Sequence, residues 1–267
     1  TEEEVRYLFA GDLLAQGIAT SYGIMELQIP LFGLYGACSP CGESLSLAAM
    51  CISAGYAGCV MALTSSHFAS AEKEFRFPLD YGSQRPLSAS WTVTGSGAFA
   101  LGLNQKCRAH ITGMTPGRIV DYGLKDSMNM GACMAPAAAD TVARHMEDFH
   151  VTPEEYDRII TGDLGSVGQT VLIDLLREKG IDIADRHMDC GIEIFDAEAQ
   201  DTHAGGSGCG CSAVTLAAYI LPKLESGEWK KVLFLPTGAL LSKTSFNEGK
   251  SVPGIAHAVV LESPAVK

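Results

Sequence analysis

The chain is short of positive charge. Its 267 residues contain 19 Lys and Arg against 31 Asp and Glu, so the formal net charge is −12 and the sequence pI is near 5.0. Lys and Arg are not gathered into stripes or patches. Because nucleic acid and anionic lipid surfaces are bound through such clusters, we expect a protein that binds no nucleic acid and has no broad electrostatic grip on a membrane.

The features of secreted and membrane-spanning proteins are also missing from the sequence. It opens on Thr-Glu-Glu-Glu, with neither the basic nor the apolar segment of a signal peptide. An uncharged run at 44–71 is long enough to span a bilayer. This run is rich in Ala, Ser and Gly, and Gly55 and Gly58 fall where a turn would lie. We therefore predict a buried helix, a tight turn and a buried strand.

Nine cysteines in 267 residues are too few for a disulfide-rich scaffold. Several lie among small apolar residues, so we expect reduced thiols that pack as small hydrophobic groups, in a reducing compartment. The clusters that could suggest a metal are Cys38-x-x-Cys41, Cys209-x-Cys211 and His187-x-x-Cys190. They lack the paired spacing of zinc sites, so no metal is expected, and a Cys38–Cys41 redox pair is the other minor alternative.

What the sequence does contain is an internal duplication. An apolar strand running into Gly-Asp-Leu occurs twice. Each copy continues with a helix, a short apolar segment, a second helix that begins near Ser44 or Ser212, an apolar strand and a terminal strand. The matched stretches are 5–13 with 156–164, 14–27 with 169–179, 29–37 with 192–195, 36–66 with 206–239, and 93–103 with 252–262. Strands that alternate with helices predict parallel βαβ units and an α/β fold.

Two copies predict two sheets that share helices between them. We expect an N-terminal half at 1–104, a connecting segment at 105–155 with an Ala-rich helix over 135–149, and a C-terminal half at 156–267. In the second copy the turn between helix and strand carries Lys and Glu residues, so it is solvated. The equivalent apolar run of the first copy is therefore expected to lie in a protein core rather than in lipid.

Cys38 is the leading candidate for chemistry. It follows a predicted strand in Gly36-Ala-Cys-Ser and begins an uncharged helix. At a helix start, the dipole and the unpaired N–H groups favour a thiolate. The alternative is a residue chosen only for its small volume at a crowded helix start.

Asp12 and Asp163 each end a predicted strand in Gly-Asp-Leu. Such an Asp caps the next helix, or it contacts a ligand, because α/β sheets bind ligands at the carboxyl ends of their strands. Capping is the favoured interpretation for both residues. The Gly-rich segment 205–212 lacks the Lys of a P-loop, so we predict a turn where the backbone passes close to a ligand or to the other copy.

A polar segment follows the strand that ends at Thr64-Ser-Ser. His67, Glu72, Glu74 and Arg76 are expected to be solvated loop residues, with a subunit contact as the alternative. The histidines outside these clusters are expected to be isolated surface or packing residues: His110, His145, His150, His203 and His257.

The duplicated pattern with a Cys at the first helix start resembles the thiolase fold, and Gly36-Ala-Cys-Ser resembles the nucleophile turn of ketoacyl synthases. A closer resemblance, over nearly the whole chain, is to the AD family of stage V sporulation proteins of spore-forming bacteria. Its motifs stand here as GDLL (11–14), FGLYGACS (32–39), TSSHFASAEKEFRFP (64–78), TVTGSGA (92–98), MGACMAPAAADT (130–141), TGDLGSVG (161–168), HMDCG (187–191), AGGSGCGCSAV (204–214), TGALLS (237–242) and PGIAHAVV (253–260). The resemblance implies an α/β, thiolase-like duplicated βαβαβαββ fold, layered α/β/α/β/α, with a further strand and helix before Thr1 in the family.

The resemblance also implies a function. Members of the family are expected to bind dipicolinic acid, to lie peripherally on the inner membrane of the spore or forespore, and to be needed for dipicolinate uptake into the developing spore. The implied partners are other stage V sporulation A proteins and a second copy of the chain, in a homodimer of the thiolase type. No anchor, lipidation signal or basic amphipathic helix is visible, so we expect attachment through partner proteins.

The resemblance argues against condensation chemistry. Cys38 matches the nucleophile of ketoacyl synthases, but Asp163 stands where those enzymes have a catalytic His, and Ser207 where they have Asn. His and Asn donate hydrogen bonds to a developing oxyanion, which an ionised Asp would repel. We therefore expect a binding protein rather than an enzyme. Its former active-site pocket, formed by Cys38, Asp163, Ser207 and Gly95, would hold dipicolinate.

Dipicolinate is a dianion, so its place beside Asp163 needs an explanation. A bridging calcium ion, a protonated Asp163 or helix N-termini that outweigh the repulsion would each provide one. The sequence leaves the three open, and apart from calcium no cofactor is expected. Two other functions stay as alternatives: an acyltransferase that uses Cys38 on an acyl thioester, and a purely structural subunit of a membrane complex.

Overall fold

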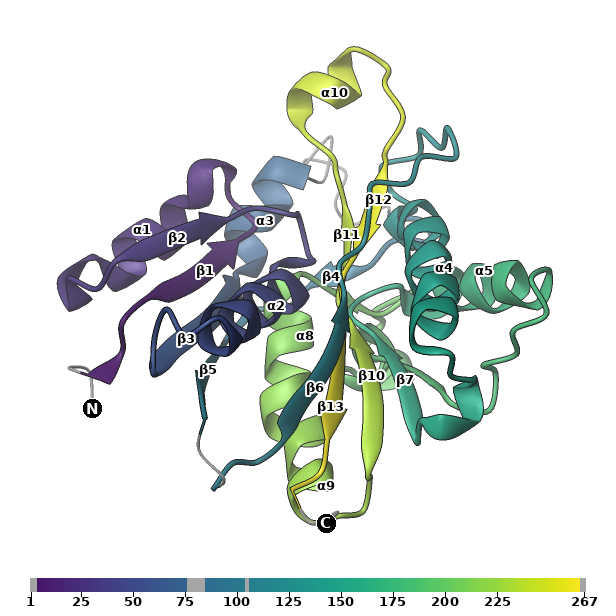
Figure 1. The fold of residues 1–267 in the computed structure, drawn as a ribbon. Helices are drawn as coiled ribbons and strands as arrows, with labels where there is room; N and C mark the ends of the chain where they lie inside the picture. The colour runs from purple at the N-terminus through teal and green to yellow at the C-terminus, as the bar shows by residue number, and fades with distance from the viewer. Residues whose placement is uncertain (1–3, 76–84, 104–105, 265–267) are drawn as a thin grey trace.

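A computed structural model describes residues 4–75, 85–103 and 106–264, and most of its strands form two mixed β-sheets (Figure 1). The first sheet has the order β2-β1-β3-β5, with β1 at Leu8–Asp12, β2 at Leu31–Leu34, β3 at Cys59–Ser66 and β5 at Gly95–Gly102. β1 pairs in parallel with β2 and β3, whereas β5 is antiparallel to β3. Every second residue of β3 is buried, which is the two-residue period of a strand.

The second sheet repeats this arrangement. Its order is β6-β13-β10-β7-β8, with β6 at His110–Thr115, β7 at Arg158–Thr161, β8 at His187–Asp189, β10 at Lys231–Leu235 and β13 at Ala258–Glu262. β7 pairs in parallel with β8 and β10, and β13 is antiparallel to β10. The additional strand β6 lies antiparallel to β13 at the sheet edge. The predicted duplication and its parallel βαβ units are confirmed.

Two helices lie between the sheets, one from each copy. They are α2 at Pro40–Ser53 and α8 at Cys209–Thr215, which continues through a π-helical turn at Leu216–Ile220 into α9 at Leu221–Glu225. Both helices contribute to one core with residues of both sheets, among them Leu45, Ile52, Leu216, Ile220, Val60 and Phe234. The two sheets therefore share their central helices, as predicted.

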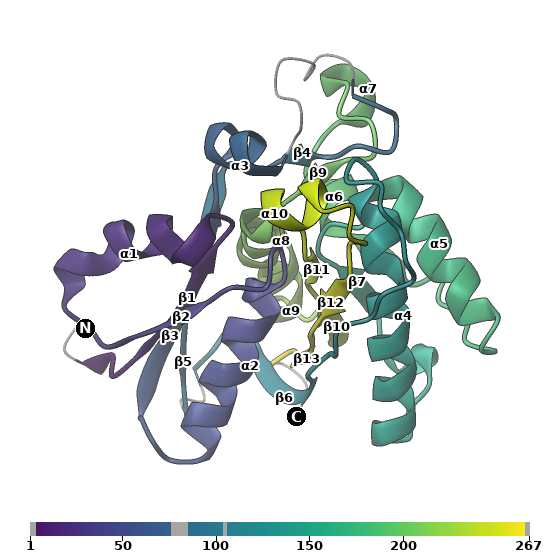
Figure 2. The same cartoon turned by 90° about the horizontal axis from the view of Figure 1, so that it is seen from above.

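Further helices complete the layers (Figure 2). On one side of the molecule lie α4 at Met130–Phe149 and α5 at Gly165–Arg177, which pack on the second sheet around Leu172, Leu176 and Val142. On the other side lies α1 at Ile18–Ile24, between 3-10 turns at Ala15–Gly17 and Met25–Leu27. The α/β/α/β/α layering expected for the fold class is confirmed.

The shorter elements surround the carboxyl ends of the parallel strands. They are α3 at Phe68–Phe75, α6 at Cys190–Glu193, α7 at Ala197–Gln200, α10 at Lys243–Asn247, and the paired strands β4 at Trp91–Thr92 with β9 at Gly206–Ser207 and β11 at Thr237–Ala239 with β12 at Gly254–Ala256. A 3-10 turn at Pro153–Glu155 precedes β7.

One predicted segment is wrong. Residues 192–195 were expected to match the short strand of the first copy, but that strand is β8, and Ile192 lies in α6. The reason is Asp189, the last residue of β8, whose side chain accepts a hydrogen bond from Ile192 N at 3.2 Å and starts the helix there.

Four helices begin earlier than expected, among them α5, which begins at Gly165 rather than at Gln169. α2 begins at Pro40 rather than near Ser44, because a proline suits the first position of a helix. α8 begins at Cys209 rather than near Ser212. α4 begins at Met130 rather than at residue 135, and the Asn129 side chain caps it by accepting from Ala132 N at 3.3 Å.

The uncharged run at 44–71 forms most of α2, a turn and β3, as predicted, and its last residues begin α3. Among the described residues, none of the helices combines the length and the hydropathy needed to cross a bilayer.

Candidate functional site

Cys38 lies in a tight turn between β2 and α2. Ala37 takes a left-handed conformation with φ of 53°, and Ser39 N donates to Gly36 O at 3.0 Å, which turns the chain directly into the helix. The Cys38 side chain is 7% exposed and belongs to a small buried cluster with Leu13, Ala71 and Cys209. The structure therefore places Cys38 at a strained helix start, next to the start of α8.

Asp163 joins three turns of the second half. Its Oδ2 accepts from Gly208 N and its Oδ1 from the Thr237 hydroxyl, both at 2.8 Å. The side chain is 2% exposed. Because both oxygens accept hydrogen bonds, the carboxylate works as a brace between the end of β7, the turn before α8 and β11.

Ser207 and Gly95 lie beside this brace. Ser207 is the last residue of β9, directly before Gly208, and it is 3% exposed. Gly95 opens β5 and packs against α8, because a Cβ at its position would lie 2.6 Å from a methyl group of Val214. The structure thus brings Cys38, Asp163 and Ser207 to the contact between the α2 and α8 starts, and places Gly95 on the flank of α8.

Asp12 has a local role, as its predicted capping function implies. Its side chain accepts from Leu14 N and from Thr20 N at 2.7 Å each, and from the Thr20 hydroxyl. Asp12 and Asp163 stand at the ends of equivalent strands, yet the Asp12 side chain bonds to the segment between β1 and α1 and to the first turn of α1. The favoured local interpretation is confirmed for Asp12, whereas Asp163 bonds to distant turns.

Two site residues were missed by the sequence reasoning. Gly238 in β11 backs the Cys38 turn, since a Cβ there would lie 2.3 Å from Gly36 O and 3.2 Å from Cys38 N. The signal in the sequence was a glycine three residues after the apolar strand that ends at Leu235. The other is Asp189, which accepts from Leu164 N at 2.8 Å and Gly165 N at 3.0 Å. It thereby fixes the turn that carries Asp163.

Burial raises the pKa of Asp189 to about 6, and the nearby Asp163 carboxylate adds to the rise. Burial also raises the pKa of the Cys41 thiol to about 12, and those of Cys190, Cys209 and Cys211 well above their ordinary value. These four thiols are therefore protonated at neutral pH and pack as small apolar groups.

The metal alternative finds no geometry within the described part of the chain, where no three His, Cys, Asp or Glu side chains are grouped to hold an ion. His187 instead hydrogen-bonds Thr161 at 3.0 Å and Gln169 at 2.9 Å, and burial lowers its pKa to about 4. His187 is therefore neutral and belongs, through Thr161, to the hydrogen-bond network around Asp189.

The segment expected to be a solvated loop is partly wrong. His67 is exposed, but Glu72 is 3% exposed and lies in α3, where it forms a buried ion pair with Arg85. The pairing explains the burial, because a buried carboxylate needs a charged partner. Glu74 is half-buried, and Arg76 lies outside the described residues. α3 also carries Ala71 of the Cys38 cluster, so this helix covers the site.

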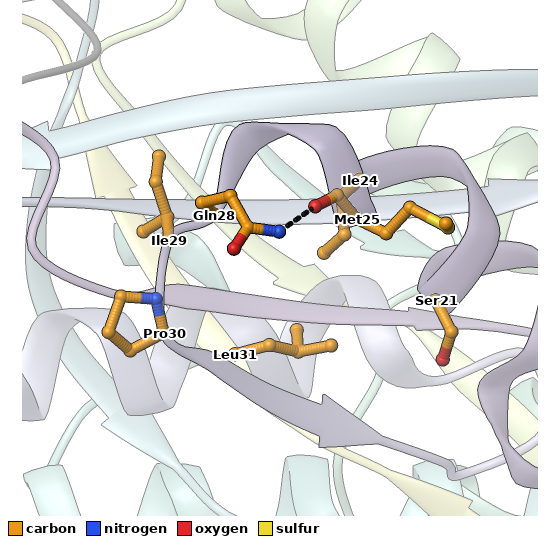
Figure 3. A pocket seen from close by; sticks show the side chains of 7 residues that line it. All are labelled: Ser21, Ile24, Met25, Gln28, Ile29, Pro30 and Leu31. Atoms are coloured by element: carbon orange, nitrogen blue, oxygen red, sulfur yellow. Dashed lines mark hydrogen bonds between the residues drawn. The ribbon is translucent and has the colours of Figure 1, made fainter.

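Two surface cavities are formed by other parts of the molecule. One of about 440 Å³ lies between α1 and β2 (Figure 3), lined by Ser21, Ile24, Met25, Gln28, Ile29, Pro30 and Leu31. The other, of about 390 Å³, is lined by Glu154, Arg158, Asp182, Ile183, Ala184, Asp185 and Arg186. Cys38, Asp163 and Ser207 line neither of these two cavities, and all three are buried.

Comparison with solved structures shows which fold this is. 3-oxoacyl-(acyl carrier protein) synthase III from Pseudomonas aeruginosa PAO1 superposes with a TM-score of 0.61 at 13% identity, over 99% of this chain and 78% of that one. Human mitochondrial 3-ketoacyl-CoA thiolase superposes with a TM-score of 0.57 at 12% identity, over 99% of this chain and 89% of that one. The chain has the thiolase fold.

Sequence comparison is more specific. The family model of Stage V sporulation protein AD matches residues 1–262. Stage V sporulation protein AD of Bacillus subtilis (strain 168) is 42% identical over 262 residues, which are 98% of this chain and 77% of that protein. Both matches extend across the two halves and all the site residues described above, and on their strength the chain belongs to the stage V sporulation protein AD family.

Proposed function

We propose that this chain binds dipicolinic acid and serves dipicolinate uptake into the developing spore. Family membership supports the sporulation role. One observation supports binding rather than catalysis: both oxygens of the Asp163 side chain already accept hydrogen bonds. Its two oxygens hold Gly208 N and the Thr237 hydroxyl, so this residue offers no hydrogen-bond donor to a developing oxyanion.

The proposed ligand site lies where Cys38, Asp163 and Ser207 meet, flanked by Gly95. The first turns of α2 and α8 start there, and their N–H groups and dipoles favour an anion. Because Asp163 and Asp189 add negative charge, a dianionic ligand needs positive charge as well. Calcium bound together with dipicolinate is the proposed companion ion.

Titration calorimetry with dipicolinate, with and without calcium, tests this function. We expect saturable binding of one dipicolinate per chain, and a Kd raised at least about tenfold by Cys38→Ala or Ser207→Ala, a loss of about 1.4 kcal/mol. Cys51→Ala is the matched control, since Cys51 is a half-buried thiol farther along α2. No heat and no thermal shift in either condition would reject the proposal; binding unaffected by both site variants would place the ligand elsewhere.

An acyltransferase is the second candidate, favoured by the strained turn of Cys38 at a helix start. It predicts an acyl adduct on Cys38, seen by intact mass spectrometry after incubation with an acyl-CoA. Cys38→Ala would abolish that adduct. A purely structural subunit predicts neither the adduct nor dipicolinate binding.

We also propose a homodimer formed along β2. This strand is an edge of the first sheet, and Leu31 and Phe32 on it are 38% and 52% exposed. An apolar edge strand left in water invites pairing with another chain. Peripheral attachment to the inner spore membrane through other stage V sporulation A proteins completes the proposed assembly.

A further inference from the structure

The carboxylate of Glu72 lies in a buried anion-binding arrangement beside the candidate site. The Glu72 Oε2 accepts from Arg85 Nη2, and its Oε1 accepts from the backbone N of Thr92 at 3.4 Å. The two side chains of the ion pair are 4% and 5% exposed. A guanidinium and a backbone N–H that converge on one carboxylate form a recognition geometry for carboxylates in general.

Arg85 is held in place by groups other than Glu72. Its guanidinium lies over the Trp91 ring at 4.0 Å and near the Phe68 ring at 5.8 Å. Its Nη1 donates to Ser90 O at 2.9 Å. The Phe68 and Trp91 rings stack on each other with centroids 5.4 Å apart. Trp91 and the Ser90 carbonyl therefore keep Arg85 positioned for a carboxylate even when Glu72 and Phe68 move away with α3.

Trp91 adds an unused donor to this cluster. Its Nε1 is buried, and it has no hydrogen-bond partner within the part of the chain that the structure describes. A buried donor without an acceptor is costly. A ligand with oxygen or nitrogen acceptors that entered this cluster would satisfy it.

The cluster is connected to the candidate site on two sides. β4, which contains Trp91 and Thr92, pairs in parallel with β9, so that Thr92 stands opposite Ser207. On the other side, Glu72 follows Ala71, which packs in the Cys38 cluster. Figure 2 shows α3 beside β4 and β9. A displacement of α3 would thus uncover Cys38 and withdraw Glu72 from Arg85 in one movement.

We propose that Arg85, the Thr92 N–H and the Trp91 indole recognise a carboxylate of dipicolinate, and that Glu72 is an internal substitute that occupies this place in the ligand-free chain. The inference rests on the proposed function and deepens it. A planar aromatic dicarboxylate fits a guanidinium that stacks on aromatic rings. Arg85 also supplies positive charge for the dianion, at a position where the ligand carboxylate replaces an existing one and leaves the local charge unchanged.

Trp91 provides the readout for the test. The chain has two tryptophans, so Trp229→Phe leaves Trp91 as the single emitter, and Trp91→Phe leaves Trp229. Titration of the full chain with dipicolinate is expected to change the fluorescence of Trp91 and not that of Trp229. A ligand that binds without altering Trp91 emission would overturn the inference.

Variants of the ion pair test the exchange. Arg85→Met alone removes the buried guanidinium that pairs with Glu72, so the double variant Glu72→Gln/Arg85→Met keeps the test valid if the single variant misfolds. We expect it to raise the dipicolinate Kd at least about tenfold, the effect of losing a hydrogen-bonded charged partner. Glu72→Gln alone is expected to lower the Kd, because it removes the competing charge.

Arg118→Met is the matched control, since Arg118 is exposed and pairs with Asp140 within the connecting segment 105–155, away from the Arg85 cluster. The Kd of this control variant for dipicolinate should equal that of the wild type. If the wild-type chain binds no dipicolinate, the proposed function itself fails. If the wild type binds and the Arg85 variants bind equally well, only the inference about Arg85 and Glu72 is overturned.

Discussion

The Asp163 carboxylate accepts a 2.8 Å hydrogen bond from the backbone N–H of Gly208. The bond ties the end of β7 to the turn before α8, at a position where Gly208 takes a φ of 106°. Thr237 adds a second donor from β11. Three chain segments are thus held at one point by a single side chain, which makes Asp163 a stability determinant as well as a site residue.

Asp163→Ala is expected to lower the free energy of unfolding by about 3 kcal/mol, because the Gly208 N–H and the Thr237 hydroxyl lose a buried charged acceptor. Urea denaturation followed by circular dichroism measures this. Asp157→Ala is the control. Asp157 accepts from two backbone N–H groups, those of Lys230 and Lys231, but it is only half-buried and its loss should cost less. Equal losses for the two variants would contradict the role given to Asp163.

Gly238→Ala is expected to destabilise the chain by about 1–3 kcal/mol, the cost of forcing a methyl group into a packed region. The new methyl would meet Gly36 O and displace the Cys38 turn. Gly23→Ala in α1 is the matched control, because a Cβ there meets nothing within 4 Å and alanine favours helices. Thermal unfolding distinguishes the two. A Gly238 variant as stable as the wild type would contradict this close packing, because it would show that β11 can move away from the Cys38 turn without loss of stability.

The buried His145 should make stability depend on pH. Its Nε2 bonds the Tyr156 hydroxyl at 2.6 Å, and its Nδ1 the Thr115 hydroxyl at 2.8 Å. Burial, helped by Lys231, lowers its pKa to about 4 from 6.5. The folded state thus disfavours the proton. The stabilisation is fully present above pH 6.5 and is lost as pH falls toward 4, by about 3 kcal/mol.

Two other buried groups titrate in the same range. His187, with its pKa lowered to about 4, acts in the same direction as His145, whereas Asp189, with its pKa raised to about 6, acts in the opposite one. The contribution of His145 is therefore measured as the difference in pH dependence between a His145 variant and the wild type. His145→Gln should flatten the slope of unfolding free energy between pH 6.5 and 4, with a substitution at the exposed His67, His67→Gln, as the control variant. An unaltered slope in the His145 variant would show that this residue does not carry the dependence.

The proposed β2 dimer predicts that a charge on the edge strand separates the protomers. Leu31→Lys is expected to shift the chain from dimer to monomer in analytical ultracentrifugation, because desolvating an ammonium opposes edge pairing. Leu103→Lys is the control: Leu103 is 85% exposed and follows β5 on the opposite edge. A Leu31 variant that stays dimeric would move the interface away from β2.

The sequence alone was sufficient for the fold, whereas the ligand site stays a prediction. Periodicity and duplication predicted β1, α2, β3 and α5, since these depend on local patterns. The sequence could not distinguish the role of Asp12 from that of Asp163, because both residues stand in the same Gly-Asp-Leu motif. Their difference lies in partners: Asp12 bonds within 8 residues, whereas Asp163 bonds 45 and 74 residues away.

Long-range pairing also explains why the places of Glu72 and Gly238 were not predicted. Glu72 reads as a surface residue until Arg85 is placed against it. Gly238 reads as an ordinary strand-end glycine until the Cys38 turn is brought to it. Burial created by the meeting of distant segments leaves no periodic signal in either segment.

The sharing of α2 and α8 bears on the history of the molecule. The second-copy helix α8 packs on the first-copy strands β3 and β5, and the first-copy helix α2 touches the second-copy strand β13. Once a duplicated ancestor had adopted this arrangement, neither half could be released as an independent folding unit without exposing an apolar sheet face. We expect the two copies to melt in a single cooperative transition, and gene fission between them to yield fragments that fold only when they reassociate.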